Sequence, residues 1–271
     1  MHGIGGYRCI RKVIRIMAVF IFSAIFFLYG IVIGSFLNVL ILRIPIKESF
    51  TLKRSHCMTC NHKLAWYDLF PLFSYLFLGG KCRYCKARIS AQYPIVEALN
   101  GILYVIIFLM SGLDGLSVET FLYCLCTSAL ISLSVIDWRT QEIPFGFNVF
   151  IFILGLVRLV TDLGNWSQYV IGLFAVSGFL FLLWLLTGGK GIGGGDIKLM
   201  AATGLLIGWQ LNIIAFLLGC ILASIIHSSL MAIKKADRVL AFGPYLSAGV
   251  YIAMIWGEQL VSWYLSMWAT F

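Results

Sequence analysis

Long apolar runs separated by short polar segments dominate the hydropathy pattern of the chain. Most of these runs approach the roughly 20 residues that a helix needs to cross the hydrocarbon core of a bilayer. We predict eight spanning helices, at approximately residues 16–42, 94–111, 118–137, 145–162, 167–188, 197–208, 210–233 and 244–265. The sixth run is short for a complete crossing, which is typical of a broken or tilted segment shielded from lipid by protein. The predicted fold is an all-α polytopic membrane protein.

Composition supports this fold class. The 271 residues are 61% hydrophobic and 11% charged, whereas a soluble domain is normally about a quarter charged. The formal net charge of +9 could suggest a nucleic-acid partner. The basic residues lie in the connecting loops of a membrane protein, however, and the positive-inside bias explains them without nucleic acid. The sequence does not indicate an oligomeric state.

The basic loops also predict the orientation of the chain. Residues 43–93 alone carry nine Lys and Arg residues. With eight spans, all the basic loops fall on one face: 43–93, 138–144, 189–198 and 234–243. That face is expected to be cytosolic. The N-terminal residues Arg8, Arg11, Lys12 and Arg15 fall on the other face, and the four concordant loops outweigh this one terminus.

Two acidic residues stand at the ends of apolar runs. Asp137 ends the third run, and Asp196 follows a glycine-rich loop, Gly191–Gly195, at the start of the sixth. An acidic side chain in hydrocarbon costs about 2.5–3.5 kcal/mol and is a functional candidate by default. The predicted topology places both at the cytosolic level, which suggests an aspartyl pair. The glycine loop lacks the preceding strand of a dinucleotide site, so we expect its glycines to admit a substrate backbone.

Residues 46–92 form a polar insert that is too long for a simple turn. The pairs Cys57/Cys60 and Cys82/Cys85 have two residues within each pair and 21 between the pairs. This spacing is typical of a tetrahedral four-thiolate zinc site, which is structural because no ligand position stays open. Two disulfides or four free thiols are the alternatives, and a reducing cytosol argues against disulfides. Metal binding would supply folding energy to an insert with little core.

Further polar residues lie near the ends of the first two runs. Gly30 and Gly34 form a small-residue face, with Asn38 one turn after Gly34. Such a face permits close helix packing, so Asn38 either makes an interhelical hydrogen bond or contacts substrate or cofactor. Glu97 lies near the start of the second run. It either caps the first helical turn or makes a polar contact facing the zinc insert or the active site.

In order along the chain, these motifs resemble the type IV prepilin peptidases, members of the Gly-x-Gly-Asp family of membrane aspartyl proteases. The matching segments are Gly34–Val39, Arg43–Pro45, the two Cys pairs, Tyr93-Pro94 with Glu97, Asp137 with Ile143-Pro144, Gly193–Asp196 with Lys198, and Phe242–Pro244. The resemblance covers nearly the whole chain after the first 30 residues. It implies three parts: an N-terminal region with the first helix (1–45), the cytosolic zinc insert (46–92) and a protease domain (93–271).

The resemblance implies a bifunctional enzyme of the bacterial cytoplasmic membrane. It would cleave the leader of prepilin or pseudopilin substrates after a glycine on the cytosolic side, and then methylate the new N-terminus with S-adenosylmethionine. Asp137 and Asp196 would be catalytic, with Gly193, Gly195 and Lys198 in support. The substrate or methyl-transfer region would contain Gly34, Asn38, Arg43, Pro45 and Glu97. The chain shows no soluble-type methyltransferase fingerprint, so the second activity follows from the resemblance alone.

Helix polarity predicts how the pair divides the proton chemistry. Asp137 ends a helix, where the negative pole disfavours ionisation, whereas Asp196 begins one and Lys198 follows it. We therefore predict Asp196 as the base and Asp137 as the acid.

Three other functions are weighed against this reading. The enzyme could be a peptidase without methyltransferase activity. A presenilin-type or signal-peptide-peptidase-type protease would need a Tyr-Asp and a Pro-Ala-Leu motif, but Ile136 precedes Asp137 and Tyr245 follows Pro244. A cation or proton carrier could also use intramembrane carboxylates, but its repeated halves are not visible.

Overall fold

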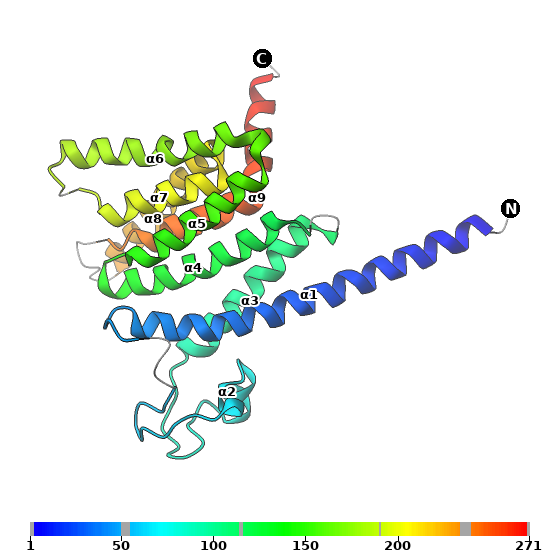
Figure 1. The fold of residues 1–271 in the computed structure, drawn as a ribbon, viewed down its shortest axis with the longest axis vertical. Coiled ribbons are helices and arrows are strands. Elements are labelled where there is room, and N and C mark those ends of the chain that lie inside the picture. The colour runs from blue at the N-terminus through cyan, green and yellow to red at the C-terminus, as the bar shows by residue number, and fades with distance from the viewer. Residues whose placement is uncertain (1–2, 50–54, 114–115, 190, 234–239, 270–271) are drawn as a thin grey trace. The chain divides into compact units, whose positions relative to one another are not determined.

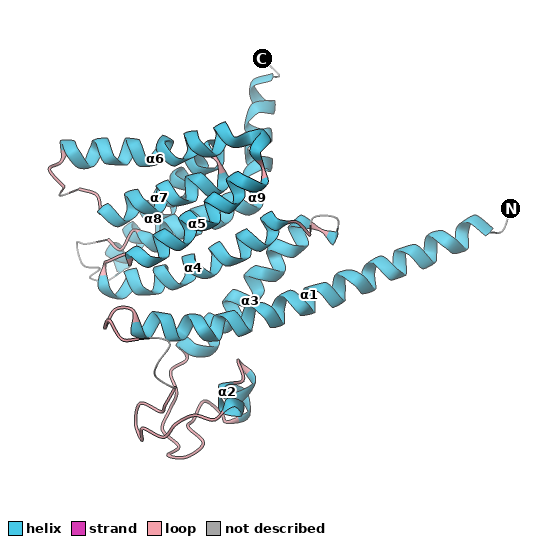
Figure 2. Ribbon diagram, in the orientation of Figure 1, coloured by secondary structure: helices cyan, strands magenta, loops and turns pink. Residues whose placement is uncertain are grey.

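The structure is a computed structural model that describes residues 3–49, 55–113, 116–189, 191–233 and 240–269. These residues form helices joined by loops, with no strand among them apart from two isolated β-bridges in the insert (Figures 1 and 2). The predicted all-α class is confirmed. The chain divides into two compact units, Met1–Cys124 and Leu125–Phe271.

The first unit contains α1 (Gly3–Arg43), the insert with the short helix α2 (Phe73–Phe77), and α3 (Gln92–Ser111). The helices α1 and α3 pack through glycines, as the small-residue face predicts. A Cβ atom at Gly30 would lie 2.6 Å from the Cα atom of Gly101, and one at Gly34 would lie 2.7 Å from the Cα atom of Glu97. The side-chain amide of Asn100 donates to the Gly30 carbonyl at 2.7 Å, so this crossing has both close backbones and a buried hydrogen bond.

The helix α4 (Val118–Thr140) begins in the first unit and ends in the second. The second unit continues with α5 (Phe145–Thr161), α6 (Trp166–Leu186), α7 (Gly194–Ile207), α8 (Trp209–Ile233) and α9 (Gly243–Ala269). Each predicted span corresponds to one of these eight long helices. In the described part of the chain, five helices are long and apolar enough to cross a membrane, and α5 is a shorter apolar helix.

The helix α7 lies at the centre of the second unit, packed against α5, α6, α8 and α9. Leu199, Met200 and Leu206 on α7 are fully buried. With 14 residues the helix rises only about 21 Å, less than the ~30 Å hydrocarbon core, so the prediction of a short, protein-covered sixth segment holds. The Asn212 amide donates to the carbonyls of Gly172 and Met200, and its oxygen accepts from the Thr203 hydroxyl. This network links α6, α7 and α8.

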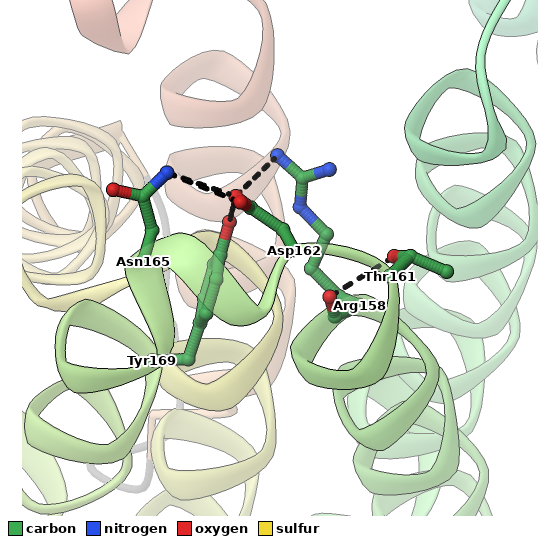
Figure 3. A network of polar contacts seen from close by, with 5 residues as sticks. All are labelled: Arg158, Thr161, Asp162, Asn165 and Tyr169. Atoms are coloured by element: carbon green, nitrogen blue, oxygen red, sulfur yellow. Dashed lines mark hydrogen bonds and ion pairs between the residues drawn. The ribbon is translucent and has the colours of Figure 1, made fainter.

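The turn between α5 and α6 is fixed by a polar network around Asp162 (Figure 3). Its carboxylate accepts from the Tyr169 hydroxyl at 2.6 Å and from the Asn165 amide at 3.1 and 3.2 Å, and Arg158 lies 3.8 Å away. These partners, the Tyr169 hydroxyl foremost, lower the pKa of Asp162. The carboxylate therefore joins side chains from the end of α5 and the beginning of α6.

Candidate active site and metal site

Asp137 lies in the last turn of α4 with its side chain buried, at 4% exposure. Its Oδ2 atom accepts a hydrogen bond of 2.9 Å from the backbone N–H of Gly243, the first residue of α9. A Cβ atom at position 243 would lie 2.7 Å from that oxygen, so only glycine fits without displacing the carboxylate. A helix N-terminus favours an anion, and the start of α9 therefore supports negative charge on Asp137.

Asp196 is the third residue of α7 and is 8% exposed. Its backbone N–H donates to the Gly193 carbonyl at 3.1 Å. A Cβ atom at Gly193 would lie 2.9 Å from the Asp196 Oδ2 atom, and one at Gly195 would lie 2.9 Å from the Ile143 Cβ atom, whereas one at Gly194 would meet nothing within 4 Å. The Gly-x-Gly-Asp pattern thus has a steric cause, because the outer glycines are crowded and the middle one is not.

The structure brings Asp137 and Asp196 together within the second unit. Both carboxyl groups are buried, and the charge of Asp137 acts on Asp196. The ends of three helices, α4, α7 and α9, supply the carboxyl groups and the Gly243 N–H. Two buried carboxyls that share a site hold one proton between them more readily than two charges. Such a pair can take a proton from water and return one to a leaving group.

Sequence reasoning gave no role to Asn148, although its amide is only 4% exposed on α5. Its Nδ2 atom donates to the Gly195 carbonyl at 3.5 Å, next to Asp196. Its Oδ1 atom is buried with no hydrogen-bond partner among the described residues. An amide in an apolar run needs a partner, and the same rule that singled out Asn38 would have found Asn148. Gly243 was part of a quoted motif but had no predicted contact.

Lys198 does not point to a buried partner. Its side chain is exposed, and its Nζ atom lies 5.1 Å from the centre of the Phe145 ring. This cation–π contact links α7 to the start of α5, and the supporting role of Lys198 stays a prediction.

The other predicted site residues lie in the first unit. The Asn38 amide donates to the carbonyls of Gly34 and Tyr93 at 3.3 and 3.1 Å, and its oxygen accepts from Gln92 at 3.4 Å, so the interhelical hydrogen bond is present. The Arg43 guanidinium donates to the Ser49 carbonyl at 3.2 Å, and Pro45 lies in the turn after α1.

The position predicted for Glu97 needs correction. Because α3 begins at Gln92, Glu97 lies in the second helical turn, and it does not cap the first. Its Oε2 atom accepts a 2.7 Å hydrogen bond from the Leu72 backbone N–H in the insert. The contact facing the insert, the alternative to capping, is the one that the structure contains.

The four cysteines of the insert converge. The sulfur atoms of Cys57, Cys60, Cys82 and Cys85 all lie within 4.8 Å of one another. Those of Cys57 and Cys85 are 3.8 Å apart, which matches the roughly 3.8 Å between ligands of a tetrahedral site with Zn–S bonds of about 2.3 Å. Backbone N–H groups of Cys60 and Thr59 lower the pKa of the Cys57 thiol to about 6, which favours the thiolate that a metal needs. This donor set fits zinc.

Each Cys pair sits on the same local turn. Asn61 donates its N–H to the Cys57 carbonyl at 2.9 Å, and Lys86 donates to the Cys82 carbonyl at 3.0 Å. Both follow the second Cys of their pair and have positive φ, 55° and 60°. Each turn is closed by an isolated antiparallel bridge, His56 with Lys63 and Lys81 with Arg88. Two matching turns therefore present two sulfur atoms each to a common centre.

Together these features define a helical membrane protein with a buried aspartyl pair and a four-thiol insert. Two family models match the chain: "Bacterial Peptidase A24 N-terminal domain" at residues 28–111, with all four cysteines, and "Type IV leader peptidase family" at residues 124–228, with both aspartates. The chain belongs to the type IV prepilin leader peptidase family.

Curated relatives agree along almost the full length. The prepilin leader peptidase/N-methyltransferase of Aeromonas salmonicida (strain A449) is 34% identical over 283 residues, covering 91% of this chain and 94% of the relative. The proteins of the same name from Bacillus subtilis (strain 168) and Pseudomonas aeruginosa are 33% and 32% identical, over 90% and 88% of this chain and 98% and 91% of theirs. No solved structure gives a significant match.

Proposed function

We propose that this protein cleaves the leader peptide of prepilin-like substrates after a glycine and then methylates the new N-terminal amine with S-adenosylmethionine. Asp137 and Asp196 are both buried, at the end of α4 and the start of α7, and the charge of Asp137 acts on Asp196. This pair is the observation that supports the cleavage. The names of the relatives support the substrate and the second activity. The enzyme would act in the bacterial cytoplasmic membrane, with its active site and zinc insert at the cytosolic face.

The pair would act by general acid–base catalysis. One ionised carboxylate takes a proton from water, whose oxygen attacks the scissile carbonyl carbon, and the other carboxyl donates its proton as the peptide C–N bond breaks. The products are a free carboxylic acid and a free amine, without a covalent enzyme intermediate. The N–H of Gly243 would hold the Asp137 carboxylate in place, and burial of both groups would keep out bulk water.

Both aspartates have a helix N-terminus nearby, so the choice of the initial base depends on the pair as a whole. The N-terminus of α7 at Asp196 favours charge there, as the sequence predicts, but the Gly243 N–H at the N-terminus of α9 gives Asp137 a similar stabilisation. Coupled groups titrate as a unit. The assignment of Asp196 as base therefore stays a prediction, and one shared proton is the state that we propose for the free enzyme.

The substrate would reach the pair at the boundary between its polar leader and its apolar segment. A peptide bond inside a helix is shielded by its own hydrogen bonds, so the helix must open at the cleavage position. Glycine destabilises a helix by about 1 kcal/mol relative to alanine, which favours opening at a glycine.

The first unit would serve methyl transfer. Gly34, Asn38 and Glu97 come together where α1 crosses α3, and Arg43 and Pro45 lie at the end of α1. Zinc, held by the four thiolates, would fix the fold of the insert and supply no catalytic chemistry. The basic residues of the insert would lie against anionic lipid headgroups.

The direct test uses the purified full-length protein with a synthetic prepilin-like peptide and S-adenosylmethionine, followed by mass spectrometry. Loss of the leader and gain of one methyl group on the product are expected. Asp196→Asn protein should leave the full-length peptide uncut, yet methylate a peptide supplied without its leader. A cut but unmethylated product would restrict the enzyme to peptidase activity, and an intact peptide with active controls would contradict the proposal.

A further inference from the structure

An uncharged, apolar segment interrupts the otherwise basic insert. Residues 69–80, Leu-Phe-Pro-Leu-Phe-Ser-Tyr-Leu-Phe-Leu-Gly-Gly, contain no charged side chain. Several of their side chains project outward: Leu76 is 71% exposed and Phe77 is 86% exposed, and Phe70 and Phe73 are also exposed. Single exposed apolar residues are ordinary, but a contiguous cluster marks an interaction surface. We call residues 70–77, which include α2, the apolar hook.

The hook is fixed to a membrane-spanning helix by a buried carboxylate. The Leu72 N–H, immediately before α2, donates to Glu97 Oε2 at 2.7 Å, and the Ser35 side chain also bonds Glu97. Glu97 itself is buried. Leu72 has φ 59° and ψ −50°, a conformation that non-glycine residues rarely adopt. The contact with Glu97 therefore holds this backbone in a specific, otherwise unfavourable turn.

Glu97 lies near the beginning of α3. It is the sixth residue of α3, so it lies about 7.5 Å along the helix axis from the first residue. The helix has 20 residues and is a candidate span, and its length of about 30 Å equals the hydrocarbon thickness. Figure 1 shows α2 level with the body of α1 and not beyond its C-terminal end. The hook is therefore attached within the length of the candidate span α3, and not beyond its end.

The outer surface of α3 is apolar at the same depth. Ile95, Leu99 and Ile102 are exposed and follow a helical spacing of four and three residues, so they form one exposed apolar stripe. Ile95 precedes Glu97, so the exposed apolar surface of α3 begins before the residue to which the hook is attached.

We propose that the apolar hook inserts into the lipid at the membrane boundary and anchors the zinc insert there, with Glu97 as the tether that sets its depth. Short apolar elements rich in Phe and Leu bind membranes in this way, and flanking cations strengthen the binding to anionic lipids. Lys63 and Lys81 are exposed on either side of the hook. The partner is the bilayer itself, and a failure of this proposal would leave the proposed cleavage chemistry standing.

Photocrosslinking tests the lipid contact. The photoreactive amino acid p-benzoylphenylalanine is placed at Phe77 in the full-length protein, which is embedded in nanodiscs of phosphatidylethanolamine and phosphatidylglycerol. Two matched sites serve as controls: Phe20, 75% exposed in the span of α1, and Met58, 78% exposed in a zinc turn. We expect phospholipid adducts at position 77 at a yield within twofold of position 20, and few at position 58. A yield at 77 no higher than at 58, or adducts to a second protein chain, would overturn the proposal.

Glu97 variants test the tether. Glu97→Leu removes the acceptor for the Leu72 N–H, and we expect the lipid-adduct yield at position 77 to fall at least twofold, with bound zinc unchanged. Glu97→Gln keeps an acceptor oxygen and should restore the yield. An unchanged yield in Glu97→Leu would show that Glu97 does not set the depth. If Glu97→Leu does not fold, Phe77→Asp replaces it, with the crosslinker at Leu76, where the same twofold loss is expected and an unchanged yield refutes the hook.

Discussion

Alanine substitutions in the run Gly193–Gly195 provide a sharp test of the active-site geometry. The three glycines differ in what a new methyl group would meet: the Asp196 carboxylate at Gly193, Ile143 at Gly195, and open space at Gly194. None of the three has a positive φ, so backbone strain does not separate them. The structure therefore predicts that Gly193→Ala and Gly195→Ala impair cleavage and that Gly194→Ala does not.

The expected size follows from the contact distances. A Cβ atom at 2.9 Å is about 0.5 Å closer than an ordinary van der Waals contact of 3.4 Å. Gly193→Ala must therefore displace the Asp196 carboxylate by about 0.5 Å. Because a misplacement of about 1 Å at a reacting group can cost about 100-fold in rate, we expect a loss of about tenfold in kcat for this variant. At Gly195 the same overlap pushes on Ile143, and we expect a loss of similar size.

The assay measures initial cleavage rates of a prepilin-like peptide by the purified variants, at saturating and at low substrate. Gly194→Ala should stay within twofold of the natural protein, and its thermal stability should equal or exceed it because alanine favours α7. A loss of activity in Gly194→Ala as large as in the other two would refute the reasoning. Such a result would mean that the glycines are needed to let the substrate backbone approach, and not to leave space around the Asp196 carboxylate.

Three further outcomes are expected. Cys82→Ser should lose most of the bound zinc, measured by metal analysis, because one of four converging thiolates is removed; full zinc retention would contradict the site. Asn148→Leu removes the donor to the Gly195 carbonyl and should slow cleavage up to about tenfold, the value of one hydrogen bond; an unchanged rate would show that this contact does not position the loop. Asp162→Asn should lower the melting temperature at pH 7, and the difference should shrink as the pH falls below the ordinary carboxyl pKa and through the lowered pKa of folded Asp162; a difference that does not shrink on acidification would contradict the role of the charge.

The sequence was sufficient for features that depend on neighbours along the chain. The eight apolar runs needed only their lengths, and the helices α3 to α9 begin and end within a few residues of the predictions. The four cysteines could be assigned because each pair forms a local turn with a known donor spacing. The exception is α1, which begins at Gly3 and not near residue 16, because Lys12 and Arg15 are exposed and do not interrupt a helix.

Contacts between distant backbone groups could not be predicted. The partner of Asp137 is a backbone N–H 106 residues away, and the partner of Glu97 is a backbone N–H 25 residues away. A backbone donor is present at every residue except proline, so no side-chain pattern marks the one that is used. This is why the sequence left open whether Glu97 caps the helix or contacts the insert, and why the structure was needed to identify the Leu72 N–H as its partner.

The central claim is that Asp137 and Asp196 act as one catalytic unit, and the cleavage rates of their single and double asparagine variants test it most directly. Groups that act together are not additive, so each single variant should lose cleavage by about 1,000-fold or more, and the double variant should lose little beyond that. All three proteins should still methylate a peptide supplied without its leader, which shows that they are folded. Losses that multiply in the double variant, or a single variant within tenfold of the natural rate, would contradict the shared site.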